Sequence, residues 1–474
     1  MSVWRFRPMA AAVGLLCSIA PQAQASSLFA TERGVRPLGR AGAFVAGADD
    51  GQSVWMNPAG LADAGDTLSF DGAVVLSPID YTRQTETRDA DGVRRVVEFG
   101  KVTGTTAPVP IPSFIYTKKM SDKWTGALSL VIPYGSPRTF PATLNGQPAP
   151  QRYADISLDG TALAIVGAHG AYKVSERFRV GAGLQLMVGR VKDHKVLGTS
   201  FPDRVAGAPE APDFDADVTV SAIVVTPSLN AGMTWLPSDH VRVGVSAQAP
   251  FYVYAPATVE ATLPSTAVIR GGFQEGNTGT VSLWLPPILR AGIEYRTDKS
   301  GVGLRVEAAY VREFLSMFDR VRFEPNDISV RDLSILPSPL PVPGVEVRNR
   351  TNDWGSYRLG AEYISGRGAG AFTLRGGAQY NEESVANRYT TVNNYGPASV
   401  IVTAGLGYQV SDKIRLDAVY AKALDYSVTV KAQNAAVTKD LIYQGNPTQL
   451  EAHNGGRYES SLDVFGLGFH YAMQ

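Results

Sequence analysis

The feature that most constrains this chain is an alternation of apolar and polar side chains that recurs along most of its length. In the segment Thr67–Tyr81 one face is apolar (Leu68, Phe70, Val74 and Leu76) and the other is polar (Ser69, Asp71 and Ser77). A period of two is that of a β-strand with its two faces in different media. Repeats of about ten residues, separated by turn residues, are typical of strands in an outer-membrane barrel.

Thirteen further segments show the same pattern, so the sequence predicts fourteen strands. Short connections, such as Pro237–His240 and Val410–Lys413, alternate with long ones rich in Pro, Gly, Asn and Asp, which we assign to the extracellular side. An even count with this alternation favours an all-β fold, an antiparallel transmembrane β-barrel; a soluble β-sandwich or β-propeller is the alternative. The further segments are Ile111–Lys119, Trp124–Thr139, Asp155–Val174, Phe178–Lys195, Val218–Leu236, Val241–Ala257, Thr280–Arg296, Gly303–Phe323, Val345–Ser365, Gly370–Glu383, Ser399–Val410, Ile414–Lys431 and Tyr458–Tyr471.

The first 25 residues have the pattern of a secretory signal peptide. Arg5 and Arg7 precede an apolar stretch from Met9 to Ala20, and Ala23-Gln24-Ala25 forms a small-x-small cleavage site. The apolar stretch is shorter than the roughly 20 residues that a membrane-spanning helix needs. Lipoprotein processing at Cys17 is an alternative, but Leu16 stands where a small residue is required. We therefore expect a mature chain that begins near Ser26 and is exported.

Composition excludes several classes of function. Cys17 is the only cysteine, so the mature chain has neither disulfides nor thiolate metal sites. Removing Arg5 and Arg7 leaves 42 basic and 44 acidic residues, a net charge of −2 that does not favour nucleic-acid binding. No catalytic or phosphate-binding motif occurs, so we expect no enzyme, cofactor or metal. A lipase, the alternative, would need a luminal serine close to a histidine such as His169 or His470.

The segment between the cleavage site and the first strand does not alternate. Residues 26–66 carry regularly placed glycines among small alanines, a composition that suits tight packing of backbone against backbone. A flexible periplasmic tail is the alternative, but a tail would be more polar. We therefore divide the chain into a signal peptide (1–25), an N-terminal hatch (26–66) and the barrel (67–474).

The hatch and several strands resemble one family. Three runs in the hatch, in this order and spacing, are similar to the plug of the FadL/TodX outer-membrane transporters of long-chain fatty acids and hydrocarbons. They are Gly34-Val35-Arg36-Pro37-Leu38-Gly39-Arg40-Ala41-Gly42-Ala43, then Ala48-Asp49-Asp50, then Asn57-Pro58-Ala59-Gly60. The resemblance continues in Leu283–Tyr295, Asp353–Tyr363 and Tyr408–Tyr420. It implies a fourteen-stranded barrel closed by a hatch, the count obtained independently from periodicity, with Gly39, Gly42, Asp49, Asp50, Asn57, Pro58 and Ala59 in the hatch.

The resemblance also implies a mechanism. A hydrophobic molecule would be captured on extracellular loops, move to a pocket beside the hatch and leave sideways through a kink in the third strand. By position that strand is Trp124–Thr139, and the kink falls at Pro133, Tyr134 and Gly135. Two prolines nearby remove two ladder donors, and Gly135 tolerates a bend. The alternative is that Pro133 and Pro137 only mark the outer end of the strand.

The ligand-binding candidates fall into two groups. Apolar residues in two predicted loops suit a capture patch, or else pack the loops together: Phe140, Leu144 and Tyr153, with Leu197, Phe201, Val205 and Phe214. A carboxylate ligand would be met by a buried luminal cation, for which we consider Arg190, Lys192 and Lys195, or Arg348 and Arg350. Ordinary luminal ion pairs are the alternative for each of these cations.

The expected function is passive uptake of hydrophobic molecules, above all long-chain fatty acids, across the outer membrane of a Gram-negative bacterium. Aromatic hydrocarbons are the alternative ligand, and a non-conducting structural or adhesive barrel is the alternative function. The expected partners are the ligand, outer-membrane lipids and the barrel assembly machinery. The last strand resembles the C-terminal assembly signal of outer-membrane barrels, except that Ala472-Met473-Gln474 follow the usual terminal aromatic, here Tyr471.

Overall fold

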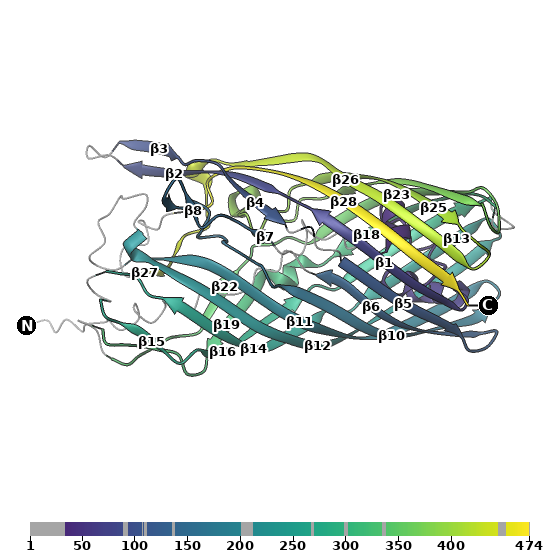
Figure 1. Cartoon of the computed structure of the whole chain (residues 1–474), viewed down its shortest axis with the longest axis horizontal. Coiled ribbons are helices and arrows are strands. Elements are labelled where there is room, and N and C mark those ends of the chain that lie inside the picture. The colour runs from purple at the N-terminus through teal and green to yellow at the C-terminus, as the bar shows by residue number, and fades with distance from the viewer. Residues whose placement is uncertain are drawn as a thin grey trace, which may run out of the picture.

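The computed structural model shows a closed antiparallel β-barrel with a short helical segment inside it (Figure 1). The structure describes residues 34–88, 93–106, 108, 111–134, 138–200, 212–266, 270–297, 302–333, 338–443 and 452–473. In these ranges no helix is long and apolar enough to span a membrane.

Fourteen antiparallel strand positions form the wall among the residues described. β1 pairs with β5 on one side and with β28 on the other, Thr67 facing Ala472, so the sheet closes on itself. Long connections gather at one end of the barrel and short turns at the other, where the chain ends (Figure 1). The strands are β1 (Thr67–Leu76), β5 (Ile111–Lys119), β6 (Trp124–Tyr134), β10 (Ala162–Ser175), β11 (Phe178–Ser200), β12 (Asp215–Ser238), β13 (Val241–Gln248), β17 (Ile288–Arg296), β18 (Gly303–Glu313), β23 (Trp354–Ile364), β24 (Phe372–Asn381), β25 (Ser399–Gln409), β26 (Ile414–Val430) and β28 (Gly456–Ala472).

Several wall strands are interrupted and continue toward the long loops as separate pieces. Proline accounts for two of the breaks, since Pro250 and the pair Pro286–Pro287 lack the N–H groups that a ladder needs. A third break holds a short helix, η4 (Leu315–Asp319). The continuing pieces are β2 (Ile79–Arg88), β4 (Val102–Thr106), β7 (Arg138–Thr139), β14 (Phe251–Thr262), β16 (Thr278–Leu285), β19 (Arg320–Pro325) and β22 (Val345–Arg348).

Several short strands and 3-10 helices lie at the long-loop end of the barrel. β3 (Arg94–Glu98) forms a hairpin with β2 that projects beyond the wall in Figure 1. β27 (Asp440–Tyr443) pairs in parallel with the end of β11. The others are β8 (Thr143–Leu144), β9 (Gln147–Pro148), β15 (Phe273–Glu275), β20 (Ser329–Arg331), β21 (Leu340–Pro341), η3 (Pro212–Phe214), η5 (Asn387–Tyr389) and η6 (Ala432–Asn434).

The fold class and the fourteen-strand count are confirmed, but some predicted bounds are wrong. The strand predicted from Asp155 begins only at Ala162, because residues 156–158 bond instead to Arg138, Phe140 and His194. The single strands predicted for Val241–Ala257, Thr280–Arg296, Gly303–Phe323 and Val345–Ser365 are each divided in two. Alternation continues through these breaks, so periodicity alone does not detect them.

The inward faces of the strands change character along the barrel. Toward the short turns they carry buried polar and charged residues, for example Asn230 on β12, Glu294 on β17 and Glu307 on β18. Toward the long loops the same wall is apolar inside, with Ala216, Val218, Val220, Ala222 and Val224 on β12 and Phe251, Val253, Ala255, Ala257 and Val259 on β14. We call these regions the lower and the upper lumen.

Candidate functional site

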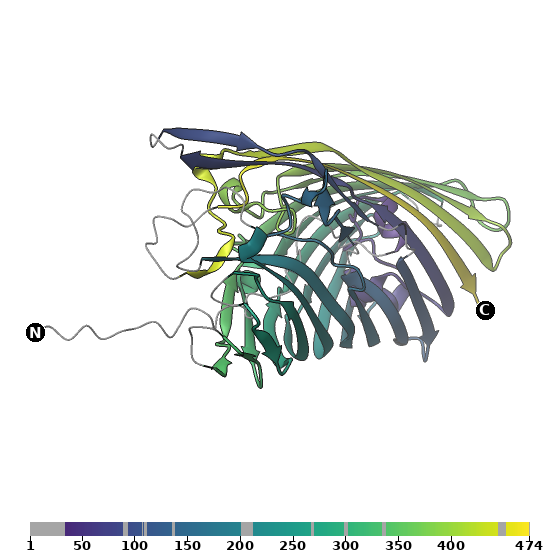
Figure 2. The ribbon, with the colours of Figure 1, turned by 60° about the vertical axis from the view of Figure 1, so that its left-hand side comes forward.

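The N-terminal segment Gly34–Asp66, here called the hatch, fills the lower lumen. It contains α1 (Val35–Gly39), α2 (Ser53–Met56) and a 3-10 helix, η2 (Pro58–Asp63). In Figure 2 its helices lie within the wall, toward the end that carries the C-terminus. Elements of four to six residues are too short to be stable alone. The surrounding wall must therefore hold the hatch in its conformation.

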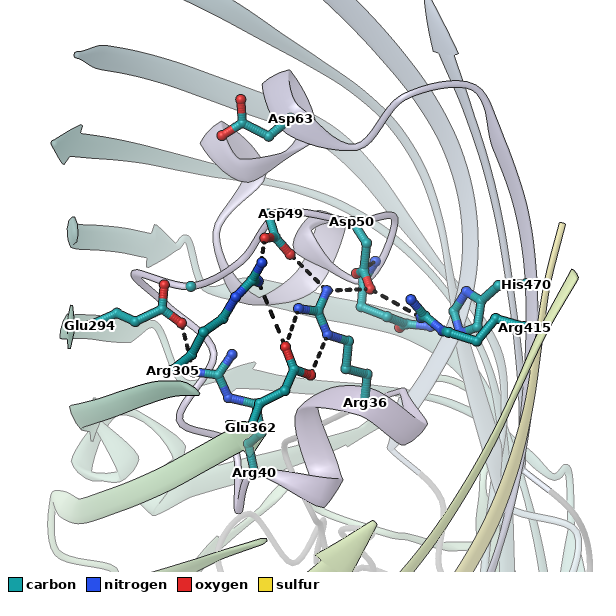
Figure 3. Close-up of polar contacts among 12 residues, drawn as sticks. Arg36, Arg40, Asp49, Asp50, Asp63, Glu294, Arg305, Glu362, Arg415 and His470 are labelled. Carbon is teal, nitrogen blue, oxygen red and sulfur yellow. Dashed lines mark hydrogen bonds and ion pairs between the residues drawn. The ribbon is translucent and has the colours of Figure 1, made fainter. Parts of the chain in front are cut away.

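Arg36 is the centre of one ionic network between hatch and wall (Figure 3). Its guanidinium group contacts Asp49 at 2.7 Å, Asp50 at 2.9 Å and Glu362 of β23 at 2.8 Å. Arg305 of β18 contacts Asp49 at 2.7 Å. Although burial opposes ionisation, Arg36 and Arg305 hold the pKa of Asp49 well below its usual range. Asp49 therefore remains charged, and its ion pair with Arg305 fixes the hatch to the wall.

A second network lies around Glu307 of β18. Its carboxylate accepts the backbone N–H groups of Val45, Ala46 and Gly47 at 2.6, 2.9 and 2.9 Å. Arg40, fully buried, contacts Glu307 at 3.2 Å and Glu294 of β17 at 2.9 Å. One wall carboxylate thus binds three successive amides of the hatch loop. A Cβ on Gly47 would lie 2.2 Å from Glu294, so this loop approaches the wall too closely for a side chain.

The Asn-Pro-Ala motif positions the C-terminal part of the hatch against the wall. Asn57 accepts the N–H of Ala59 and donates to the carbonyls of Val45 and Met233 and to Thr234 Oγ1. A Cβ on Gly181 of β11 would lie within 2.5 Å of the backbone of Pro58 and Ala59. Asn57 therefore ties two turns of the hatch to β12, and the next residues pack on a wall glycine.

The structure places the hatch residues named from the sequence inside the barrel, and most of them contact the wall. Gly39 packs against Gly405 of β25, and Gly42 has a φ of 72°, which favours glycine. The sequence pattern did not single out the wall partners, Glu294, Arg305, Glu307 and Glu362. A signal for them exists, since each is a charged residue at an inward position of a strand.

An apolar cluster connects the long-loop end with the hatch. It includes Val330 and Leu340 near the loops, the inward residues of the upper lumen, and Trp55, Met56 and Leu61 of the hatch. It also includes Val131 and Tyr134 at the end of β6. Luminal faces of outer-membrane barrels are usually polar, so a buried apolar lining of this extent is unusual.

The wall is interrupted beside this cluster, at the third strand. Among the residues that the structure describes, the ladder between β5 and β6 ends at the pair Phe114–Leu130, and the next pair is Thr106 of β4 with Arg138 of β7. Between β6 and β10 the register shifts by one residue, because Leu163 faces Tyr134 while Ile165 faces Val131. This is a β-bulge at Ile132–Pro133. Pro133 lies within β6, whereas Gly135 is outside the residues that the structure describes.

Comparison with known families decides the identity of the fold. The model of the outer membrane protein transport protein family (OMPP1/FadL/TodX) matches residues 16–473. The chain belongs to this family. Its members are outer-membrane transport proteins for hydrophobic compounds, so the chain is a passive transporter of the outer membrane rather than an enzyme. A comparison with curated proteins gives no match.

Solved structures of low sequence identity have the same fold. A Pseudomonas aeruginosa FadL homologue aligns with a TM-score of 0.69 at 15% identity, covering 95% of this chain and 100% of the other. The Ralstonia pickettii toluene transporter TbuX aligns with a TM-score of 0.59 at 15% identity (93% and 98%). The P. putida toluene transporter TodX gives 0.59 at 16% (91% and 97%).

Among the five cations considered for the lumen, Arg190 and Arg350 are placed elsewhere. Arg190 lies on the outward face of β11, in phase with the exposed Leu184 and Leu186, and donates to Ser221. Arg350 is exposed in the turn after β22. The prediction of a luminal position is therefore wrong for both, because each falls on the other face or outside the strand. Lys195 does face inward and is 4% exposed, 2.9 Å from Asp193.

The predicted capture residues pack the loops together instead of facing water. Phe140 is 2% exposed in a cluster with Tyr81, Tyr395 and Tyr458, and Leu144 packs against the same cluster. Leu197 is 1% exposed and belongs to the apolar cluster of the upper lumen. Phe201 lies outside the described residues. A water-facing patch at Phe140 and Leu197 is thus contradicted, because the long loops fold inward over the lumen.

A serine, a histidine and an aspartate do meet in the lower lumen. Ser69 Oγ lies 2.8 Å from His470 Nδ1, and His470 Nε2 lies 3.1 Å from Asp417. Asp417 also binds Arg375 at 2.6 Å and Arg415 at 2.8 Å, so these contacts belong to the ionic lining of a cavity of about 440 Å³ below the hatch. Since the family consists of transport proteins, we interpret them as structural.

Proposed function

We propose that this chain carries long-chain fatty acids through the upper lumen to the hatch and releases them sideways at the interruption of the third strand. The observation that carries the proposal is the apolar cluster, which includes loop residues, hatch residues and the end of β6. A molecule that partitions poorly into water gains about 0.8 kcal/mol for each CH₂ group that such a lining removes from water. A non-conducting barrel would have no need of this lining.

The lateral exit is supported by the pairing of the wall. Strands that span a membrane satisfy their backbone groups through continuous ladders. Among the described residues of the third strand, the last pair with β5 is at Leu130, a bulge follows at Ile132–Pro133, and the next pair with the neighbouring chain is at Arg138. The apolar residues Val131 and Tyr134 flank this point from inside. An exit here would deliver the ligand directly into the membrane, without passage through the hatch.

Buried cations close to this exit favour a ligand with a carboxylate, such as a fatty acid, over a hydrocarbon. Arg138 is fully buried at the interruption, where it donates to the carbonyls of Val392 and Ser77. Lys195 is buried on β11, next to the residues that follow β7 in the chain, and forms an ion pair with Asp193. A carboxylate could share either cation. Arg138 was not among the cations considered from the sequence.

Aromatic hydrocarbons are the second candidate. The residues above the exit form an aromatic cluster in which the rings of Tyr81 and Tyr458 are 4.4 Å apart and Tyr395 lies 6.0 Å from Tyr458. Planar apolar molecules stack well on such rings. The solved relatives TbuX and TodX are toluene transporters.

The test is uptake of labelled oleate and labelled toluene by cells with the intact gene, with a deletion, and with a variant that lacks Pro133. Removing one residue at the bulge should restore a continuous register and close the exit, so uptake should fall to near the level of the deletion strain. Pro227→Ala is the matched control, because Pro227 stands in a wall ladder that runs on without a shift.

Three outcomes separate the parts of the proposal. The variant is folded if its migration in SDS gel electrophoresis changes on heating. If the folded variant still takes up the labelled compounds, the proposal of a lateral exit is wrong. If toluene uptake depends on the gene and oleate uptake does not, the fatty-acid assignment is wrong. If neither does, uptake of both ligand classes is excluded.

A further inference from the structure

A second interruption of the wall lies in the region of β16–β19, and its outer side forms a pocket. β17 pairs with β18 up to Ile288–Glu313, and β16 pairs with β19 from Leu283–Val321 onward. The helix η4 occupies the break, with Leu315 and Phe318 buried in the apolar cluster and Met317 40% exposed on the outside. The break is therefore closed from within by side chains but indented from without.

The pocket faces the membrane. Its volume is about 380 Å³, and its lining includes Tyr252, Leu283, Trp284, Met317 and Arg320. Tyr252 and Trp284 are exposed side chains on the outward faces of β14 and β16, with ring centroids 4.6 Å apart. Exposed aromatic pairs of this kind mark the level at which a barrel leaves the hydrocarbon core and enters the head-group region.

Cations lie at the upper rim of the pocket. Arg320 and Arg322 of β19 and Arg348 of β22 all point outward and share one carboxylate, Glu346, at 3.8, 2.9 and 3.3 Å. Asp319, also in the lining, accepts the backbone N–H of Arg350. Glu324 follows on the outward face, one pair closer to the long loops. Within the pocket lining itself, Arg320 and Arg322 are accompanied by one carboxylate, that of Asp319, so the lining has a net charge of +1.

We propose that this pocket binds a phosphorylated glycolipid of the outer leaflet, with an acyl chain against Trp284 and Met317 and a head-group phosphate at Arg320 and Arg322. In an outer-membrane barrel the short turns face the periplasm, so the long-loop end that carries these arginines lies in the outer leaflet. Basic pockets next to apolar surface recognise anionic lipid head groups, and guanidinium groups bind phosphate in a bidentate manner. The proposal does not depend on which ligand the lumen transports.

The experiment measures lipid binding by the purified full chain in detergent, by native mass spectrometry and by the lipid-induced rise in thermal unfolding temperature. The probes are bisphosphorylated lipid A and the same lipid with both phosphates removed. The variant Arg320→Gln/Arg322→Gln is compared with Arg94→Gln/Arg95→Gln, which removes the same charge from the exposed β3 strand, away from the wall. Met317→Trp, intended to fill the pocket, tests the apolar part.

We expect the phosphorylated lipid to bind the unaltered protein at least about tenfold more tightly than the dephosphorylated one, since contacts to a charged group are lost with the phosphates. Arg320→Gln/Arg322→Gln should remove that difference while the unfolding temperature without lipid stays the same, and Arg94→Gln/Arg95→Gln should not. Met317→Trp should weaken both lipids. Equal binding of the two lipids by the unaltered protein would overturn the proposal. Full binding of lipid A by the Arg320→Gln/Arg322→Gln variant would do so as well, and so would displacement of lipid A by oleate or toluene.

Discussion

The lower and the upper lumen belong to one barrel wall, but their inward side chains differ in character. Below, β12, β17, β18 and β23 turn Asn230, Glu294, Glu307 and Glu362 inward, and each contacts the hatch. Above, β12, β14 and β16 turn Val220, Val253 and Leu283 inward, and these line an apolar interior. Strand geometry is common to both regions. The difference shows that the inward residues alone decide whether a barrel segment holds a plug or lines an apolar interior.

The two regions also differ in how strongly a single substitution changes the stability of the folded protein. Buried ions in the lower lumen are stable only while their partners remain, because an unpaired buried charge is costly. The stability of the apolar lining depends on the buried apolar area, so it tolerates exchanges between apolar side chains of different shape more readily. We therefore expect the largest effects of substitution in the lower lumen, and the following predictions are ordered accordingly.

The largest effect is expected for Glu307→Gln. Among the described residues, the change leaves Arg40 with Glu294 as its remaining ion-pair partner, and it weakens the acceptor of three hatch amides. Breaking a buried pair costs about 3–5 kcal/mol, which should appear as faster hydrogen exchange at Val45–Gly47 while the wall strands keep their protection. Glu260→Gln, an exposed position on the outward face of β14, is the control. Unchanged protection in Glu307→Gln would mean that the plug is held by packing alone.

Val220→Asp should have the next largest effect, now on the upper lumen. The carboxylate would replace a 1% exposed apolar side chain directly opposite the buried Asp193, whose charge is already paired with Lys195, at a cost of about 2–3 kcal/mol. Oleate and toluene uptake should both fall while exchange in the hatch stays the same. Thr219→Asp places the same group one residue away on the opposite face of β12. Equal loss of uptake in both variants would contradict an apolar route through this lumen.

A smaller effect is expected for Gly47→Ala. The added Cβ would lie 2.2 Å from the carboxylate of Glu294 and 2.8 Å from that of Glu307, so the loop or these ion-paired carboxylates must shift, at a cost of about 1–3 kcal/mol. Gly72→Ala on β1 is the matched control, because nothing lies within 4 Å of its added Cβ. Thermal unfolding in detergent should separate the two; equal unfolding temperatures would show that the hatch loop has room to adjust.

The smallest effect is expected from pH. The pKa of Asp49 is lowered in the folded protein by Arg36 and Arg305, so its contribution to stability is present above its unfolded pKa of about 4 and is lost only well below that value. The loss of hatch protection caused by Asp49→Asn, measured by hydrogen exchange and corrected for the intrinsic pH dependence of exchange, should therefore be the same at pH 7 and pH 5. A much smaller loss at pH 5 would show that Asp49 is already protonated there and does not hold the plug as a charged group.

The sequence by itself determined the barrel. Alternation over fourteen segments specified strands with two different faces, and a closed sheet is the arrangement that satisfies their backbone groups in lipid. The glycine-rich segment and its Asn-Pro-Ala motif located the hatch, and the resemblance to its family is confirmed by the match over residues 16–473. The exit at Pro133 and the ligand remain predictions.

Only the tertiary structure decided which residues meet. Glu307 and Gly47 are 260 positions apart, and the face on which Arg190 lies depends on the phase of a strand, which a shift of one residue reverses. Buried loop residues such as Phe140 look like surface residues in sequence, because nothing local records that the loops fold back into the lumen. The pairs that hold the plug are contacts across the barrel, set by closure of the sheet.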